Sequence, residues 1–237
     1  MIAVVSSTMA PDTSLCRDGV RTSFSVDERV EQTRITLNSL TRIGISSILI
    51  MDNSPENVAP RFAGHLSQGR IIHCPQPLFS NRGLGEIWLL LAALPYIADG
   101  APVLKLSARY CLDEDTPLAR AYDADFVGRA YGSQKCRTVS TRAYVLRDKS
   151  VAESLWRATL EEMYADSGRV VGPRSAWKVL RKALHVAPTA FPDGEPSGSV
   201  ERSLYTASSR LALRHHLLSR LGLKGVIAGA SQTPIDE

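Results

Sequence analysis

The sequence lacks any stretch that could cross a membrane and any pattern typical of a structural metal site. Its longest apolar stretch, from Ile87 to Ala98, contains Pro95 and is shorter than the roughly 20 residues that a bilayer span requires. The four cysteines lie far apart, without a C-x-x-C pair or a histidine pair close to them, so no structural zinc site is predicted. The first five residues lack the basic segment of a signal peptide, and we expect a cytoplasmic protein.

Excess charge is also missing from most of the chain. The formal net charge is +4, and residues 201–224 carry a net charge of +4 by themselves, with five Lys or Arg against one Glu. Leucines alternate there with arginines, which predicts a basic amphipathic helix over 204–223. Such a helix could contact an anionic membrane surface or pack on the domain with its charges in water. Tyr205 is the single Phe, Trp or Tyr residue among residues 201–224, and nucleic acid is not expected as the partner.

The hydrophobic pattern predicts alternating strands and helices. Short apolar runs predict strands at 2–7, 46–51, 70–74 and 102–106, and apolar periodicity predicts helices at 26–42, after the 81–86 loop, and at 150–165. The first strand, helix and strand form a β-α-β unit, for which a right-handed parallel crossover is the default. Residues 125–129 and 138–147 are predicted to pair antiparallel at a sheet edge. Residues 178–187 are predicted to form a second basic patch, helical or strand-like, and residues 9–24 and 188–199 are predicted to be loops. The expected fold is a single α/β domain with a mostly parallel central sheet flanked by helices.

Small polar residues follow the first two predicted strands, where open α/β sheets bind ligands. Ser6 and Ser7 end the first strand, and Asp52 and Ser54 follow the second. Asp52 could accept hydrogen bonds from a ribose hydroxyl or a base N–H group. The alternative is an Asp-Asn-Ser-Pro turn that these residues favour through local hydrogen bonds alone.

A glycine-containing loop precedes the apolar helix. Asn81, Gly83 and Gly85 leave backbone room beside a helix start, where exposed N–H groups suit a phosphate, although a simple helix cap explains the same residues. Glu86 is either a partner of the helix dipole or an acceptor for a sugar hydroxyl.

This order of elements resembles the N-terminal half of GT-A glycosyltransferases over roughly residues 1–130. The run from Lys105 to Tyr110 is also similar to the Lys-x-Ser/Thr-Gly-Arg-Tyr element of bacterial polysaccharide glycosyltransferases, with Ala108 in the place of glycine. In those enzymes the element replaces a metal-binding Asp-x-Asp motif. The resemblance implies that residues 1–130 bind the nucleotide sugar, that 131–200 form the acceptor-side half, and that 201–237 form a C-terminal helix and tail. It assigns the following residues to the donor site: Ser6, Ser7, Asp52, Ser54, Asn81, Gly83, Gly85, Glu86, Ser107 and Tyr110.

Two ways of stabilising a leaving diphosphate are open. Lys105 and Arg109 could neutralise it without a metal, since fixed cations stabilise developing negative charge. Alternatively, Asp113 and Asp115 could hold Mg or Mn, which prefer oxygen ligands. A third possibility is that Arg109 simply pairs with the acidic 113–115 cluster.

A transferase that activates a hydroxyl group needs a general base. By analogy with the acceptor-side helix of such enzymes, Glu161 and Glu162 are the candidates, although adjacent glutamates on a helix also suit a solvated face. The function predicted is sugar transfer from a nucleoside-diphosphate or CMP sugar to a hydroxyl acceptor, which could be a glycan, a lipid-linked sugar or a small metabolite. The alternatives are a nucleotidyltransferase, an inactive scaffold and a nucleic-acid-binding α/β protein.

Overall fold

The computed structural model describes residues 1–11, 24–62, 69–76, 79, 81–133, 137–167, 198–226 and 234–237. The basic patch predicted at 178–187 lies outside these residues. So do most of the loops predicted at 9–24 and 188–199. None of the helices in the described ranges is long and apolar enough to span a bilayer.

The predicted β-α-β unit is confirmed. Strand β1 (Ile2–Ser7) pairs in parallel with β2 (Ser47–Asp52), in a register that runs from Ile2 opposite Ser47 to Ser7 opposite Asp52. Helix α1 (Val26–Arg42) connects them. Its first turn is closed by a reciprocal capping box between Ser25 and Glu28, which satisfies two N–H groups that lack helical partners.

The central sheet has seven strands in the order β10-β6-β9-β4-β1-β2-β3. Among the strands that the structure describes in this sheet, only β9 runs against its neighbours, and its position between β4 and β6 is inside the sheet. The edge position predicted for residues 138–147 is therefore wrong. This segment also contains two separate strands, because residues 140–142 leave the sheet between them. The strands not yet given bounds are β3 (Gly69–His73), β4 (Val103–Ser107), β6 (Phe126–Gly128), β9 (Ala143–Leu146) and β10 (His215–Leu217).

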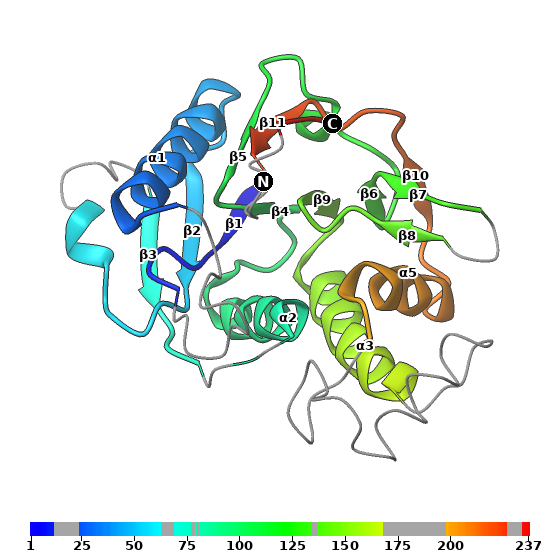
Figure 1. The fold of residues 1–237 in the computed structure, drawn as a ribbon. Helices are drawn as coiled ribbons and strands as arrows, with labels where there is room; N and C mark the ends of the chain where they lie inside the picture. The colour runs from blue at the N-terminus through cyan, green and yellow to red at the C-terminus, as the bar shows by residue number, and fades with distance from the viewer. Residues whose placement is uncertain are drawn as a thin grey trace, which may run out of the picture.

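Helices cover both faces of this sheet (Figure 1). Helix α1 lies on one face together with a small sheet of order β12-β11-β5, and the other helices lie on the opposite face. The helices on that face are α2 (Arg82–Ala93), α3 (Lys149–Ser167) and α5 (Val200–Arg210). The remaining strands are β5 (Tyr110–Leu112), β7 (Ala130–Tyr131), β8 (Thr138–Val139), β11 (Leu223–Val226) and β12 (Pro234–Asp236).

Alternation along the strands divides the core into two layers. Val4 and Met51 pack toward α2 and α3, whereas Val5 and Ile50 pack toward α1. The largest fully buried side chain, Trp156 of α3, donates its indole N–H to the Tyr144 hydroxyl at 3.0 Å. A buried tryptophan N–H needs such a partner, since leaving it unpaired would cost about 1–3 kcal/mol.

The helix predicted at 204–223 is wrong in its second half. Helix α5 ends at Arg210, and Ala212 then takes a left-handed backbone conformation with φ of 51°. The next residues form β10, which pairs with β6 in parallel and completes the sheet. Because backbone hydrogen bonds to an open sheet edge outweigh weak helical propensity, the apolar periodicity of this segment is misleading. The amphipathic helix on which the predicted membrane contact depends does not form beyond Arg210.

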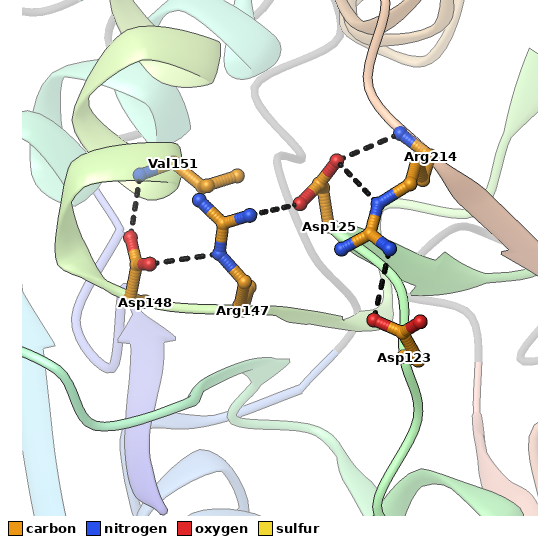
Figure 2. A network of polar contacts seen from close by, with 6 residues as sticks. All are labelled: Asp123, Asp125, Arg147, Asp148, Val151 and Arg214. Atoms are coloured by element: carbon orange, nitrogen blue, oxygen red, sulfur yellow. Dashed lines mark hydrogen bonds and ion pairs between the residues drawn. The ribbon is translucent and has the colours of Figure 1, made fainter.

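The cations of the same segment pair with acidic side chains. Arg214 contacts Asp123 and Asp125, and Arg147 contacts the other oxygen of Asp125 and also Asp148 (Figure 2). Asp125 and Arg214 precede β6 and β10, while Arg147 follows the antiparallel β9, so the network lies at the amino ends of the parallel strands. Its place at that edge indicates a structural role.

Candidate functional site

A cleft of about 470 Å³ lies at the carboxyl ends of β1, β2 and β4. Ser6, Ser7, Asn53 and Ser107 line it where these strands end. The chain runs from β1 outward to β2 and β3 and then returns to β4 on the other side of β1. Such a reversal of strand order opens a crevice at the carboxyl ends, which is where open α/β sheets bind ligands.

Arginine dominates the charge of this cleft. Among the described residues that line it, four arginines face two glutamates, Glu86 and Glu201, which leaves a net charge of +2. A concave surface of one charge concentrates oppositely charged ligands. The cleft is therefore suited to an anion. The four arginines are Arg29, Arg82, Arg109 and Arg142.

Neighbouring groups hold these arginines in place. The Nε of Arg29 donates to the Thr8 carbonyl at 2.6 Å, which ties α1 to the chain that follows β1. The guanidinium carbons of Arg109 and Arg142 lie 5.7 and 5.9 Å from the centre of the Tyr110 ring. Cations at this distance from a tyrosine ring are attracted to it. Tyr110, which the sequence assigns to the donor site, thus lines the cleft and supports two of its cations.

Lys105 lies beneath the cleft and is fully buried. Its ammonium group donates to Glu86 Oε1, to the Thr141 carbonyl, and to Ser107 Oγ at 2.8 Å. Burial lowers the pKa of Lys105, and the adjacent Glu86 carboxylate opposes this effect. All three ammonium protons are engaged within the protein, so Lys105 is not placed to contact a leaving diphosphate.

Arg109 does reach the cleft. The structure gives it no carboxylate partner among the residues that it describes, so the predicted pairing with the 113–115 cluster does not form. Ala108 does not adopt a left-handed conformation, and its N–H donates to the Ser6 carbonyl at 3.0 Å. Alanine is therefore compatible with the turn that presents Arg109.

Asp52 and Ser54 are placed below the cleft instead of in its lining. Asp52 is fully buried, and its two carboxylate oxygens accept the N–H groups of Met9 and Ser54, each at 3.0 Å. The hydroxyl of Ser54 accepts the N–H of Ala10 at 2.9 Å. Both side chains tie the chain after β1 to the end of β2, and Asn53 between them is the residue that lines the cleft.

The predicted loop at 81–86 is the first turn of α2. The Asn81 side chain caps the helix by accepting the N–H groups of Gly83 and Leu84. These amides are consequently occupied, which removes the basis for a phosphate site at this helix start. Gly83 permits close packing, because a Cβ there would lie 2.7 Å from Val200 Cβ, and both Gly83 and Gly85 line the cleft.

The residues predicted to bind a metal lie elsewhere. Asp113 accepts Arg220 Nη2 at 2.5 Å on one oxygen and lies 2.9 Å from Lys224 Nζ on the other, and Asp115 is 3.8 Å from Arg220. The hydrogen bond from Lys224 lowers the pKa of Asp113, with a further contribution from Arg220. Oxygens engaged by cations in this way do not fit Mg or Mn. Within the described ranges, no group of three or more acidic, cysteine or histidine side chains could hold a metal ion.

The two glutamates predicted as candidates for the general base, Glu161 and Glu162, also lie away from the cleft. Both carboxylates bind Arg210, at 2.6 and 3.3 Å, where α3 packs on α5. Neither residue lines the cleft. The geometry favours the structural alternative for this pair.

Part of the cleft lining was not predicted from the sequence. This wall comprises Tyr131, the 138–142 segment and the start of α5, and it is rich in hydroxyl groups. Glu237 is buried beside this wall and binds both the Tyr131 hydroxyl and Arg142. Burial, with the hydrogen bond to Glu237, raises the pKa of Tyr131 to about 12. No local pattern in the sequence predicts this wall, because it is assembled from three distant segments.

Comparisons with known proteins address the fold. Neither protein-family models nor curated protein sequences match the chain. Among solved structures, a Bacillus anthracis protein designated a glucose-1-phosphate thymidylyltransferase, in complex with sucrose, superposes with a TM-score of 0.50. It shares 8% identity, over 95% of this chain and 89% of that one.

The fold is GT-A-like. Two further structures superpose with lower TM-scores. A nucleoside-diphosphate-sugar pyrophosphorylase from Vibrio cholerae has a TM-score of 0.48 and 12% identity, covering 94% of each chain. The galactosyltransferase LgtC, in complex with donor and acceptor sugar analogs, has a TM-score of 0.45 and 10% identity over 98% and 88% of the two chains. A fold alone does not determine the reaction, so the chemistry depends on the residues of the cleft.

Proposed function

We propose that the protein is a glycosyltransferase that moves a sugar from a nucleoside-diphosphate donor to a hydroxyl group of a glycan, a lipid-linked sugar or a small metabolite. The observation that carries this proposal is the charge of the cleft. Four arginines and two glutamates give a net charge of +2, at the strand ends where this fold class binds ligands.

This charge matches one diphosphate. A nucleoside-diphosphate sugar carries a charge of about −2, whereas a nucleotidyltransferase must hold a triphosphate and a sugar phosphate with a combined charge of about −6. The larger charge would need further cations or metal ions in the cleft. The described lining residues therefore favour the glycosyl donor over the nucleotidyltransferase alternative.

Arg109 is the group best placed to stabilise the leaving diphosphate. It lines the cleft at the end of the central strand β4, beside Ser107, and no carboxylate in the described ranges pairs with it. As the bond between sugar and phosphate breaks, negative charge grows on the departing phosphate, and a fixed guanidinium stabilises that charge. The hydroxyl-rich wall around Thr138, Ser140 and Thr141 supplies hydrogen-bond partners for a carbohydrate acceptor.

Binding of nucleotides tests the proposal directly. Calorimetry with UDP, GDP and CMP and with their sugars, first with EDTA and then with Mg or Mn, should show one nucleoside diphosphate that binds. Arg109→Ala should weaken that binding by about 10- to 100-fold, as expected for a charge-assisted hydrogen bond. Arg157→Ala, which removes an exposed cation on α3, is the matched control and should leave binding unchanged.

The products separate the two enzyme classes. Release of a nucleoside diphosphate on addition of an acceptor supports glycosyl transfer, and release of pyrophosphate from a nucleoside triphosphate would establish the nucleotidyltransferase instead. Absence of binding for every nucleotide, with and without metal, would refute both.

A further inference from the structure

Within the part of the chain that the structure describes, the Glu86 carboxylate is bound on one oxygen only. Oε1 accepts hydrogen bonds from Lys105 Nζ, from Ser6 Oγ at 3.1 Å and from Ser107 Oγ at 3.4 Å. Oε2 makes no hydrogen bond with any residue that the structure describes. Glu86 lines the cleft and its side chain is 21% exposed, so Oε2 is the oxygen that a bound molecule can reach.

Lys105 fixes this arrangement. Its ammonium group has three protons, and each is donated to one acceptor. The three acceptors belong to α2, to the end of β4 and to Thr141 in the hydroxyl-rich wall. A fully buried ammonium with this partner set cannot turn toward solvent without losing them. The direction of the Glu86 side chain is therefore set before any ligand enters, which reduces the entropy that binding would cost.

The location of Glu86 indicates what it contacts. Ser107, which shares Oε1 with Lys105, is two residues before Arg109, and the Arg109 N–H donates to the Ser107 carbonyl at 2.8 Å. The carboxylate and the cation proposed to hold the diphosphate thus meet at one strand end. In a nucleotide sugar the sugar ring is bonded directly to the diphosphate, so its hydroxyl groups come close to Glu86.

We infer that Glu86 is a specificity-determining residue that accepts a hydrogen bond from a hydroxyl group of the donor sugar, and that Lys105 is the residue that positions it. This inference rests on the proposed function. Lys105 holds Oε1 of the carboxylate while the side chain lines the cleft, which places Glu86 to accept a hydrogen bond from a bound molecule. The other titratable groups around the pair are Arg109, Glu201 and Tyr144.

The inference defines a class of donor. A fixed carboxylate attracts hydroxyl groups and repels a second carboxylate, so neutral hydroxylated sugars are accepted and sugar acids are rejected. Removal of the recognised hydroxyl leaves a desolvated carboxylate oxygen unpaired, and sites built in this way discriminate strongly against the deoxy analogue.

The experiment compares the nucleoside diphosphate alone, its neutral sugar, the corresponding uronic acid and a set of monodeoxy donors. Affinities are measured by calorimetry for the wild type, Glu86→Gln and the control Glu153→Gln, which neutralises an exposed glutamate of α3 away from the cleft. We expect Glu86→Gln to bind the nucleoside diphosphate like the wild type. We also expect it to bind the neutral sugar donor about 10-fold more weakly and to lose discrimination against one deoxy donor and against the uronic acid. Glu153→Gln should retain this discrimination.

Lys105→Met tests the positioning role, and the double variant with Glu86→Gln removes both charges in case the single variant does not fold. Because Lys105 acts through Glu86, the double variant should discriminate among donors no worse than Glu86→Gln alone.

Unchanged donor discrimination in Glu86→Gln would overturn the inference while leaving the proposed function intact. A fall of kcat by more than about 1000-fold in Glu86→Gln with unaltered donor affinity would also overturn it, since that is the behaviour of a general base. Failure of the wild type to bind any nucleotide would instead refute the proposed function.

Discussion

Replacement of Asp52 by asparagine tests whether this carboxylate supports the fold or contacts a ligand. The wild-type side chain is fully buried and accepts two backbone N–H groups, from Met9 and Ser54, each at 3.0 Å. Asparagine keeps one oxygen acceptor and turns an NH₂ group toward the other amide. One buried N–H is then unpaired, which costs about 1–3 kcal/mol, and the remaining bond loses its charge assistance, which costs about 1 kcal/mol more.

We therefore expect Asp52→Asn to destabilise the protein by about 2–4 kcal/mol, which lowers Tm by about 5–15 °C for a chain of this size. Differential scanning fluorimetry at neutral pH measures this change. Asn53→Ala is the matched control at the same strand end, because Asn53 lines the cleft and its Oδ1 accepts the Thr8 hydroxyl at 2.5 Å. That variant should lower Tm little and should instead weaken nucleotide binding.

The opposite pattern would refute the structural assignment. If Asp52→Asn kept its Tm within about 2 °C while nucleotide affinity fell more than about 10-fold, Asp52 would be a ligand contact, as the sequence alone suggests.

Other predictions concern packing, backbone conformation and acid stability. Gly83→Ala places a methyl group 2.7 Å from a side-chain carbon of α5 and should destabilise by about 1–3 kcal/mol in urea unfolding. Gly85→Ala meets its nearest atoms at 3.6 Å, so it should be neutral or stabilising by up to about 1 kcal/mol, and equal effects of the two changes would contradict the packing of α2 on α5. Ala212→Gly relieves a φ of 51° and should raise stability by about 0.5–1 kcal/mol, whereas a lower Tm would be inconsistent with this conformation. The backbone N–H of Arg214, together with neighbouring guanidinium groups, lowers the pKa of Asp125, so the stability that it contributes is complete above pH about 4 and is lost as the pH falls through the lowered value. Asp125→Asn should make stability less dependent on pH between about 4 and 2, and a slope like that of the wild type would show that other carboxylates control acid unfolding.

Local patterns predicted the first half of the fold because each signal there is contained within one element. The capping box at Ser25 and Glu28 predicts the start of α1, and the apolar run at 2–7 followed by serines predicts β1 and its polar end. Parallel pairing of β1 with β2 follows from the handedness of the crossover. The carboxyl ends of these strands were thereby identified as the expected site of ligand binding.

Individual roles at that site depended on which side chains the fold buries. Asp52, Lys105 and Asn81 stand where the sequence predicts donor-binding residues, yet each is buried and satisfied by internal partners. Arg142, by contrast, carries no local signal and reaches the cleft from the turn before β9. Exposure decides between a ligand contact and a structural bond, and exposure is a property of the assembled protein.

The sequence by itself determined the α/β class, the β-α-β unit and the edge of the sheet where polar residues gather, because short-range sterics and hydrophobic periodicity specify them. Tertiary structure decided that residues 215–217 form a strand and that β9 enters the sheet between β4 and β6. It also decided that Glu86 is held by Lys105 at an arginine-lined cleft. These features depend on hydrogen bonds and ion pairs between residues far apart in the chain, whose energies exist only once the chain is folded.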